Sequence, residues 1–119
     1  MYSCYTFAKE TRKDLLKRFR PLYTDVIADH ITYEFGSKEL PPYAAEVFVY
    51  GHLTDNIGIE ALMVEVNGSL FRPDNQLYHI TWSLERAKGY KPKHTNLIIQ
   101  GYPINKFEAF EIEVYTEVR

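Results

Sequence analysis

Two short segments of this chain read almost alike: residues 29–33 (DHITY) and residues 78–82 (YHITW). Each places a histidine, an isoleucine and a threonine in a row, inside an apolar run that is typical of a β-strand. Side chains alternate between the two faces of a strand, so residues i and i+2 share a face. We therefore expect each histidine to lie beside the threonine that follows it.

The two expected strands, residues 27–35 and 77–84, offer the parts of a symmetric acid/base site. His30 and Thr32 share one face, and His79 and Thr81 share another. Histidine titrates near neutral pH, so one imidazole can accept a proton while the other donates one. Strands with such polar faces are expected to lie close together around a cleft, because burying these polar groups in a core without hydrogen-bond partners costs free energy.

Strict alternation also predicts the facing of two neighbouring residues. Ser83 is expected on the same face as His79, and Phe35 on the face opposite His30.

This pair of motifs resembles the signature of the 2H phosphoesterase superfamily, which carries two motifs of histidine, apolar residue and Ser or Thr on central strands of two pseudo-symmetric lobes. The resemblance includes an expected first strand at residues 2–8, a helix after it, and a strand at 61–66 between the motifs. It implies an α+β fold with a compact, concave antiparallel sheet and one N-terminal helix. Only residues 67–76 stand where the family has a long helix, so the expected bilobal fold has a reduced second lobe.

The resemblance also implies an activity. The expected enzyme is a hydrolase that opens a cyclic (2′,3′-type) or 2′-5′ phosphodiester of RNA or a small nucleotide. His30 and His79 would serve as acid and base, in an order that the sequence leaves open, and the rate would peak near neutral pH. Thr32 and Thr81 would donate hydrogen bonds to the phosphate oxygens. No cofactor and no metal are expected.

Three further residues are candidates for substrate binding: Tyr5, Arg72 and Tyr90. Tyr5 is on the first strand, where the family often places an aromatic residue near the cleft, although core packing explains it equally well. Arg72 precedes the second motif and could attract the phosphate. Tyr90 lies in a basic segment, residues 85–96, where it could stack on a base; a solvated loop is the alternative.

The other two histidines have plainer interpretations. His52 also begins a His-Leu-Thr tripeptide, but the segment 52–58 is rich in turn residues and predicts an exposed turn. His94 is expected in a loop. The spacing of the four histidines matches no common metal-ligand pattern.

Length and composition limit the class of protein. The 119 residues suit one domain, residues 1–119, with hydrophobic content of 45%. A net charge of -2 gives no general attraction to nucleic acid, so local groups must hold any anion. The single cysteine, Cys4, excludes an internal disulfide and favours a reducing, cytoplasmic location. No apolar run reaches the length of a membrane span, so no membrane partner is expected. The oligomeric state is left open.

Periodicity predicts the remaining elements. An amphipathic helix is expected at residues 9–22, with Leu22 on its buried stripe and with Pro21 expected to end it. The basic residues of this helix are expected on its solvent-exposed face: Arg12, Lys13, Lys17, Arg18 and Arg20. Strands are expected at residues 45–51, 59–66, 97–102 and, as one continuous strand, 107–118.

Two other functions remain open from the sequence. The same fold can serve as a non-catalytic nucleotide- or RNA-binding module, which turnover of a cyclic nucleotide would exclude. Alternatively, the chain is a small interaction domain in which the repeat is a coincidence, and the two imidazoles would then lie on opposite sides of the molecule.

Overall fold

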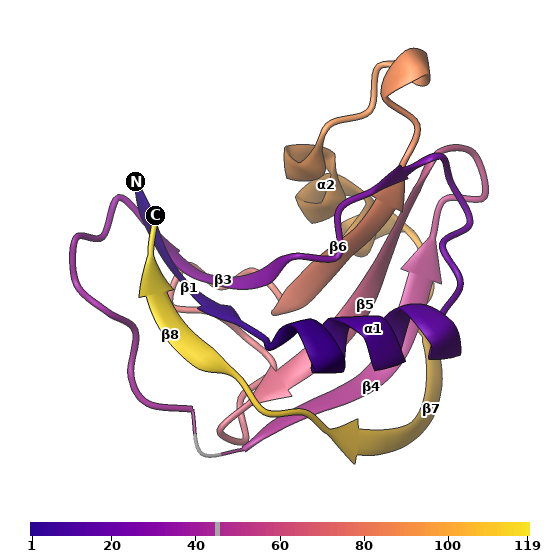
Figure 1. Ribbon diagram of the computed structural model, residues 1–119. Helices are drawn as coiled ribbons and strands as arrows, with labels where there is room; N and C mark the ends of the chain where they lie inside the picture. The colour runs from indigo at the N-terminus through magenta and orange to yellow at the C-terminus, as the bar shows by residue number, and fades with distance from the viewer. Residues whose placement is uncertain (45) are drawn as a thin grey trace.

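The chain folds into two antiparallel β-sheets and two α-helices, and a computed structural model describes residues 1–44 and 46–119 (Figure 1). The smaller sheet has the strand order β3-β1-β8, and the larger has the order β2-β6-β5-β4-β7. The strands are β1 (Tyr2–Thr6), β2 (Asp25–Val26), β3 (His30–Phe35), β4 (Val47–Thr54), β5 (Ile59–Val66), β6 (His79–Leu84), β7 (Asn105–Glu111) and β8 (Tyr115–Val118). The helices are α1 (Lys9–Arg18) and α2 (Thr95–Gly101), and 3₁₀ turns lie at Arg86–Lys88 and Pro92–His94.

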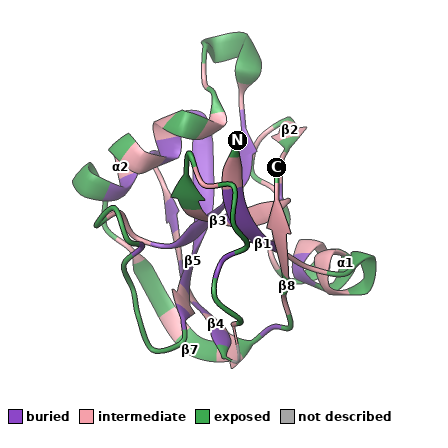
Figure 2. Cartoon of the chain, turned by 90° about the vertical axis from the view of Figure 1, so that its left-hand side faces the viewer, coloured by how far each residue is buried: buried purple, intermediate pink, exposed green. Residues whose placement is uncertain are grey.

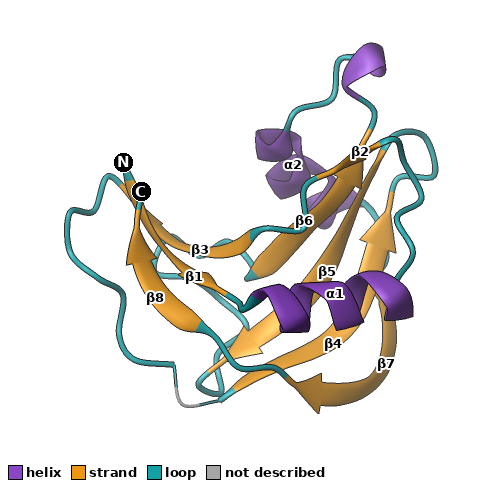
Figure 3. Ribbon diagram, viewed as in Figure 1, coloured by secondary structure: helices purple, strands orange, loops and turns teal. Residues whose placement is uncertain are grey.

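The predicted α+β class is confirmed, but the predicted single sheet with one N-terminal helix is wrong. The motif strands β3 and β6 belong to different sheets, and α2 is a second helix (Figure 3). The sequence predicts a strand at 97–102, whereas α2 takes up most of these residues. Ile98 and Ile99 of α2 pack against apolar residues of the larger sheet. These apolar residues therefore form the buried side of a short amphipathic helix.

The main core lies between the two sheets and includes α1. Trp82 and Leu62 of the larger sheet and Ile31 of the smaller one are completely buried, and Leu15 of α1 packs with them. A second core, on the other face of the larger sheet, contains Leu53, Ala61, Met63 and Ile99. Buried residues are accordingly concentrated on β5, in the middle of the larger sheet, and on β1 in the smaller one (Figure 2).

Helix α1 ends earlier than the sequence predicts. Phe19 leaves the helical conformation with φ -121° and ψ 85°, and its N–H still donates to the Leu15 carbonyl. Pro21 follows, and a proline disfavours helical backbone at the residue before it. Leu22, expected on the buried stripe, is therefore outside the helix and 58% exposed.

The first motif strand crosses from one sheet to the other. Asp25 and Val26 pair with β6, and the N–H groups of Ile27 and Ala28 still donate to carbonyls of β6. Ala28 then has φ +42°, and from His30 onward the chain pairs with β1 instead. The predicted strand at 27–35 is thus broken before the motif, and the break places β3 against β6.

A one-residue bulge on β6 changes the facing of Ser83. Glu60 pairs with Ser83 and Ala61 pairs with Thr81, so Trp82 is an extra residue on β6. Ser83 therefore turns away from Thr81 and donates a hydrogen bond to the buried carboxylate of Glu60. The prediction that Ser83 shares the face of His79 is wrong for this reason.

A matching bulge on β3 changes the facing of Phe35. Ser3 pairs with Glu34 and Cys4 pairs with Thr32, so the intervening Tyr33 is the extra residue. Phe35 pairs with Tyr2 and comes to the same face as Thr32, contrary to the prediction.

The final strand is divided between the sheets. Residues 105–111 form β7 beside β4, and residues 115–118 form β8 beside β1, so the single strand predicted at 107–118 is wrong. The strand prediction at 59–66 is confirmed as β5, and Asn67 and Gly68 both have positive φ in the tight turn after it. The prediction at 45–51 is confirmed over 47–51, and position 45 itself lies outside the described residues. Among the described residues, no helix combines the length and apolar character of a membrane span.

Trp82 joins the end of α1 to β6 and allows a test of this packing. Its Nε1–H donates to the Phe19 carbonyl at 2.8 Å, and its ring is completely buried. Trp82→Phe removes this donor and leaves a void, so we expect a loss of about 2–4 kcal/mol in the free energy of unfolding. Urea unfolding followed by circular dichroism measures it. The exposed control Tyr102→Phe should change stability by less than about 0.5 kcal/mol, and equal midpoints for both variants would contradict the expectation.

Candidate active site

The two motifs meet in one pocket of about 290 Å³ between the sheets. His30 and Thr32 reach it from β3, and His79 and Thr81 reach it from β6. The remaining lining residues are Tyr2, Ile27, Phe35, Arg72, Pro92, Lys93 and Asn96. The structure thus brings the four predicted catalytic side chains together, and the imidazoles do not lie on opposite sides of the molecule.

His79 is held as a neutral imidazole. The ring is only 8% exposed, and Nδ1 lies 2.9 Å from the Leu77 carbonyl, to which it must donate its proton. Burial lowers the pKa of His79 to about 4, and the nearby positive charges of Arg72 and His30 act in the same direction. At neutral pH the other nitrogen, Nε2, therefore carries a lone pair that can accept a proton.

His30 has a different environment. Its Nδ1 lies 3.0 Å from a carboxylate oxygen of Asp29, and Asp29 in turn forms an ion pair with Arg119. Burial lowers the pKa of His30 below 6.5, but the hydrogen bond to Asp29 opposes this effect by stabilising the imidazolium. The Tyr2 ring lies against the imidazole, with 5.2 Å between ring centres. The two histidines thus share a pocket, but only His30 has a carboxylate partner.

Positive charge dominates the lining of the pocket. Arg72 and Lys93 contribute cations, and none of the lining residues is an Asp or Glu. Arg72 is 4% exposed and is fixed by two hydrogen bonds to Asp74, of 3.1 and 2.6 Å. Its guanidinium carbon also lies 5.4 Å from the centre of the Phe35 ring. These charges and the hydroxyl groups suit an anionic ligand.

Hydroxyl and amide groups complete the polar lining. Thr81 Oγ1 shares a 2.9 Å hydrogen bond with Thr95 Oγ1, at the start of α2. Asn96, also on α2, lines the pocket, and its Oδ1 is buried without a hydrogen-bond partner in the described part of the chain. Groups of three or more His, Cys, Asp or Glu side chains that could hold a metal ion are absent from residues 1–44 and 46–119.

Two predicted substrate-binding residues lie elsewhere. Tyr5 is 1% exposed, packs in the main core and donates its hydroxyl to the Pro42 carbonyl at 2.7 Å. Tyr90 donates its hydroxyl to Asp55 at 2.6 Å, and its ring covers Gly58 so closely that a Cβ there would lie 2.5 Å from it. Of the three candidates, only Arg72 lines the pocket.

One of the two histidines outside the pocket differs from expectation. The prediction of an exposed turn at His52 is wrong, because His52 belongs to β4 and its Nε2 lies 2.7 Å from the buried Glu60 carboxylate. His94 closes a 3₁₀ turn, where its Nδ1 accepts a hydrogen bond from the Lys91 N–H.

Sequence reasoning missed the aromatic residues of the pocket. Tyr2 and Phe35 are paired across β1 and β3, with 6.0 Å between ring centres, and Phe35 is 58% exposed. The alternating pattern placed Phe35 on the wrong face, since no sequence signal marks the bulge at Tyr33. Tyr2 lies two residues from Cys4, which pairs with Thr32, so the pairing of β1 with β3 brings Tyr2 to the pocket, and the sequence carries no signal for that pairing.

Comparisons with family models, curated proteins and solved structures found no match to this chain.

The lowered pKa of His79 predicts a pH-dependent stability. Unfolded histidine titrates near 6.5, whereas the pKa of His79 in the fold is about 4. The unfolded chain therefore binds more protons between these pH values, and the free energy of unfolding must fall as the pH falls through this window. We expect about 2–3 kcal/mol of this loss between pH 7 and pH 4.5 to come from His79. Urea unfolding of wild type and His79→Gln at both pH values checks this, and the same pH dependence in both proteins would contradict it.

Proposed function

We propose that this chain is a metal-independent phosphoesterase that opens a cyclic (2′,3′-type) or 2′-5′ phosphodiester of RNA or a small nucleotide by two-histidine acid/base catalysis. One observation carries the proposal: two imidazoles and two threonine hydroxyls from separate strands line one pocket of about 290 Å³. The arrangement of the sheets supports it as well, because each sheet contributes one motif strand. This arrangement fits the bilobal fold of the 2H phosphoesterase superfamily, with a short connection in place of the second lobe's long helix.

The different environments of the histidines assign their roles. His79, neutral and with Nε2 free, is the base that takes a proton from water. The water oxygen then attacks phosphorus. The bond from phosphorus to a ribose oxygen breaks, and that oxygen takes its proton from the imidazolium of His30. Asp29 stabilises this charged form of His30 through the 3.0 Å hydrogen bond.

The other lining residues act on the phosphate and on the rest of the nucleotide. Thr32 and Thr81 donate hydrogen bonds to the non-bridging oxygens, and Arg72 and Lys93 offset the negative charge that builds up there. The Phe35 ring, at the open side of the pocket, provides an apolar surface for the base or ribose.

The lining also supports a mechanism without metal. Divalent cations such as Mg²⁺ and Ca²⁺ prefer carboxylate and carbonyl oxygens. This pocket instead contains an arginine, a lysine and two histidines, and none of its lining side chains is a carboxylate. A dication would be repelled by Arg72 and Lys93, whereas a phosphodiester monoanion is attracted.

Turnover of nucleoside 2′,3′-cyclic phosphates tests the function directly. We expect His30→Ala and His79→Ala each to lower kcat by roughly 10²–10⁴-fold, since each removes one proton-transfer group. Thr32→Ala and Thr81→Ala should cost about tenfold, because each removes one hydrogen bond to the phosphate. Chelators should have no effect.

A matched control is His52→Gln, which changes a histidine outside the pocket. It should retain wild-type kcat. Full activity in His30→Ala, or complete loss of activity with a chelator, would overturn the mechanism. Tight binding of cyclic nucleotides without turnover would instead support the non-catalytic nucleotide-binding module.

The pH profile of kcat/KM tests the roles of the histidines. His79 must be neutral and has a pKa of about 4, and His30 must be charged and has a pKa below 6.5. Because both pKa values are lowered, the profile should be bell-shaped with its maximum at lower pH than the neutrality expected from unperturbed histidine.

The variant Asp29→Asn distinguishes the acid limb of this pH profile from the alkaline limb. Removing the carboxylate lowers the pKa of His30 further, so the alkaline limb should move to lower pH while the acid limb stays in place. A profile that only falls in height, with both limbs unmoved, would show that Asp29 has a structural role alone.

A further inference from the structure

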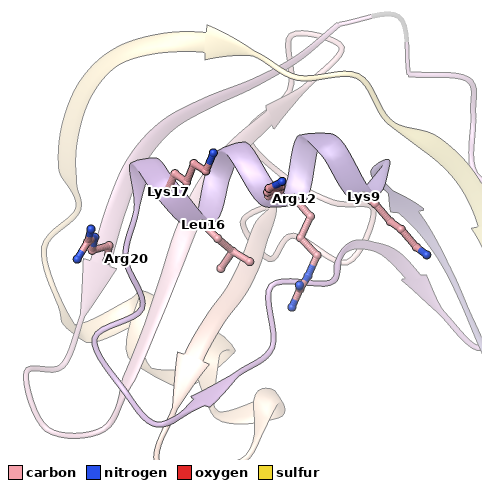
Figure 4. A pocket seen from close by; sticks show the side chains of 6 residues that line it. Lys9, Arg12, Leu16, Lys17 and Arg20 are labelled. Carbon is pink, nitrogen blue, oxygen red and sulfur yellow. The ribbon is translucent and has the colours of Figure 1, made fainter.

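A second concave surface runs along α1 on the other side of the first motif segment. Lys9, Arg12, Lys13 and Lys17 recur at intervals of three and four along this helix, so they lie on one face, and Arg20 follows just after the helix. They line an open pocket of about 700 Å³, which we call the basic groove (Figure 4). Its lining residues are Lys9, Arg12, Lys13, Leu16, Lys17 and Arg20.

The positive charge of the basic groove is unbalanced. Within residues 1–44 and 46–119, ion pairs involve His30, His52, Arg72 and Arg119, and none of the five cations of the groove. The groove thus gathers five of the 14 Lys and Arg residues of a chain whose net charge is -2.

Such a row of like charges carries a cost on a helix. Lys9, Lys13 and Lys17 follow one another at intervals of four, and like charges at this spacing destabilise a helix. Glu10 and Asp14 lie three residues before Lys13 and Lys17 and offset part of this repulsion, but neither of them lines the groove. The groove itself therefore presents five cations and no carboxylate, which suits an anionic ligand.

Arg12 connects the basic groove to the active-site pocket. Its side chain extends from α1 toward the segment that leads to β3 (Figure 4), and its Nε–H donates to the Ala28 carbonyl at 2.8 Å. Ile27, the residue before Ala28, lines the pocket. The short segment at residues 27–28 therefore lies between the two.

We infer that the basic groove binds the phosphate backbone of a single-stranded RNA whose cyclic phosphate end occupies the pocket. The inference rests on the proposed function and narrows its substrate from mononucleotides to RNA ends. The RNA strand leaves the pocket, crosses residues 27–28 and follows α1. There the lysines contact successive phosphates without recognising the base sequence of the RNA.

The chemistry of the groove favours RNA over a membrane surface. Leu16 is the single apolar side chain in its lining, whereas a helix that lies on a membrane needs a broad apolar face beside its basic residues. The phosphate backbone of a nucleic acid is held by neutralising cations alone, and the groove supplies these along its length.

The test uses the triple variant Lys13→Gln, Lys17→Gln, Arg20→Gln, since all three side chains are exposed and can be changed without disturbing the core. The two substrates are a nucleoside 2′,3′-cyclic phosphate and an oligoribonucleotide of about 12 residues with the same cyclic end. For the oligonucleotide we expect KM to rise at least about tenfold at physiological salt. The slope of log KM against log salt should also fall by about two units. Turnover of the mononucleotide should not change, because this substrate does not reach α1.

A control variant with the same change in charge is Arg86→Gln, Lys88→Gln, Lys106→Gln, which alters exposed cations outside both the groove and the pocket. It should behave as wild type with both substrates. An unchanged oligonucleotide KM in the groove variant would overturn the inference and leave the proposed function intact. An equal rise in both variants would also overturn it, because the effect would then reflect overall charge.

Failure of the proposed function gives a different result, which is that wild type turns over neither substrate. Fluorescence anisotropy of the same oligonucleotide then measures binding alone. Weaker binding by the groove variant than by the control still supports the groove, and equal binding by the two overturns it.

Discussion

The arrangement of the site depends on how the backbone hydrogen bonds of residues 25–35 are shared between two sheets. The first part of this segment, through Ala28, bonds to β6. After the turn at Ala28, where φ is +42°, the second part bonds to β1. Backbone polar groups must be satisfied when they are buried, so this exchange of partners fixes the position of β3 relative to β6. The pocket, the pairing of the motifs and the wall between pocket and basic groove all follow from it.

Within the pocket, two similar motifs become chemically different. His79 begins β6 in the larger sheet, where burial and the Leu77 carbonyl hold it neutral. His30 begins an edge strand beside Asp29, whose carboxylate stabilises the charged imidazolium. The local sequence contributes the aspartate, since Tyr78 stands at the corresponding position of the second motif. The acid/base roles that we propose would therefore arise from the unequal burial of the two histidines and from this one difference in their neighbours.

Much of the site could be predicted from the chain, and what could not be predicted follows from strand geometry. The pairing of His30 with Thr32 and of His79 with Thr81 required only the two-residue period of a strand. Phe35 and Ser83 were misplaced because each lies beyond a one-residue bulge, which reverses every later side chain. The final strand was misjudged because one alternating pattern serves equally well in either sheet, and only the break at residues 112–114 divides it.

The sequence by itself determined the α+β class, the two motif strands, the strand β5 with its turn, and the residues able to move protons. These depend on local periods and turn chemistry, which neighbouring residues carry. Only the tertiary structure decided that the motifs lie in different sheets, that residues 97–101 form part of a helix, and that Tyr5 packs in the core while Tyr2 lines the pocket. Each of these depends on contacts between segments far apart in the chain. The physical reason is that a strand's partner, and hence the surroundings of its side chains, is chosen by burial and hydrogen bonding across the whole fold.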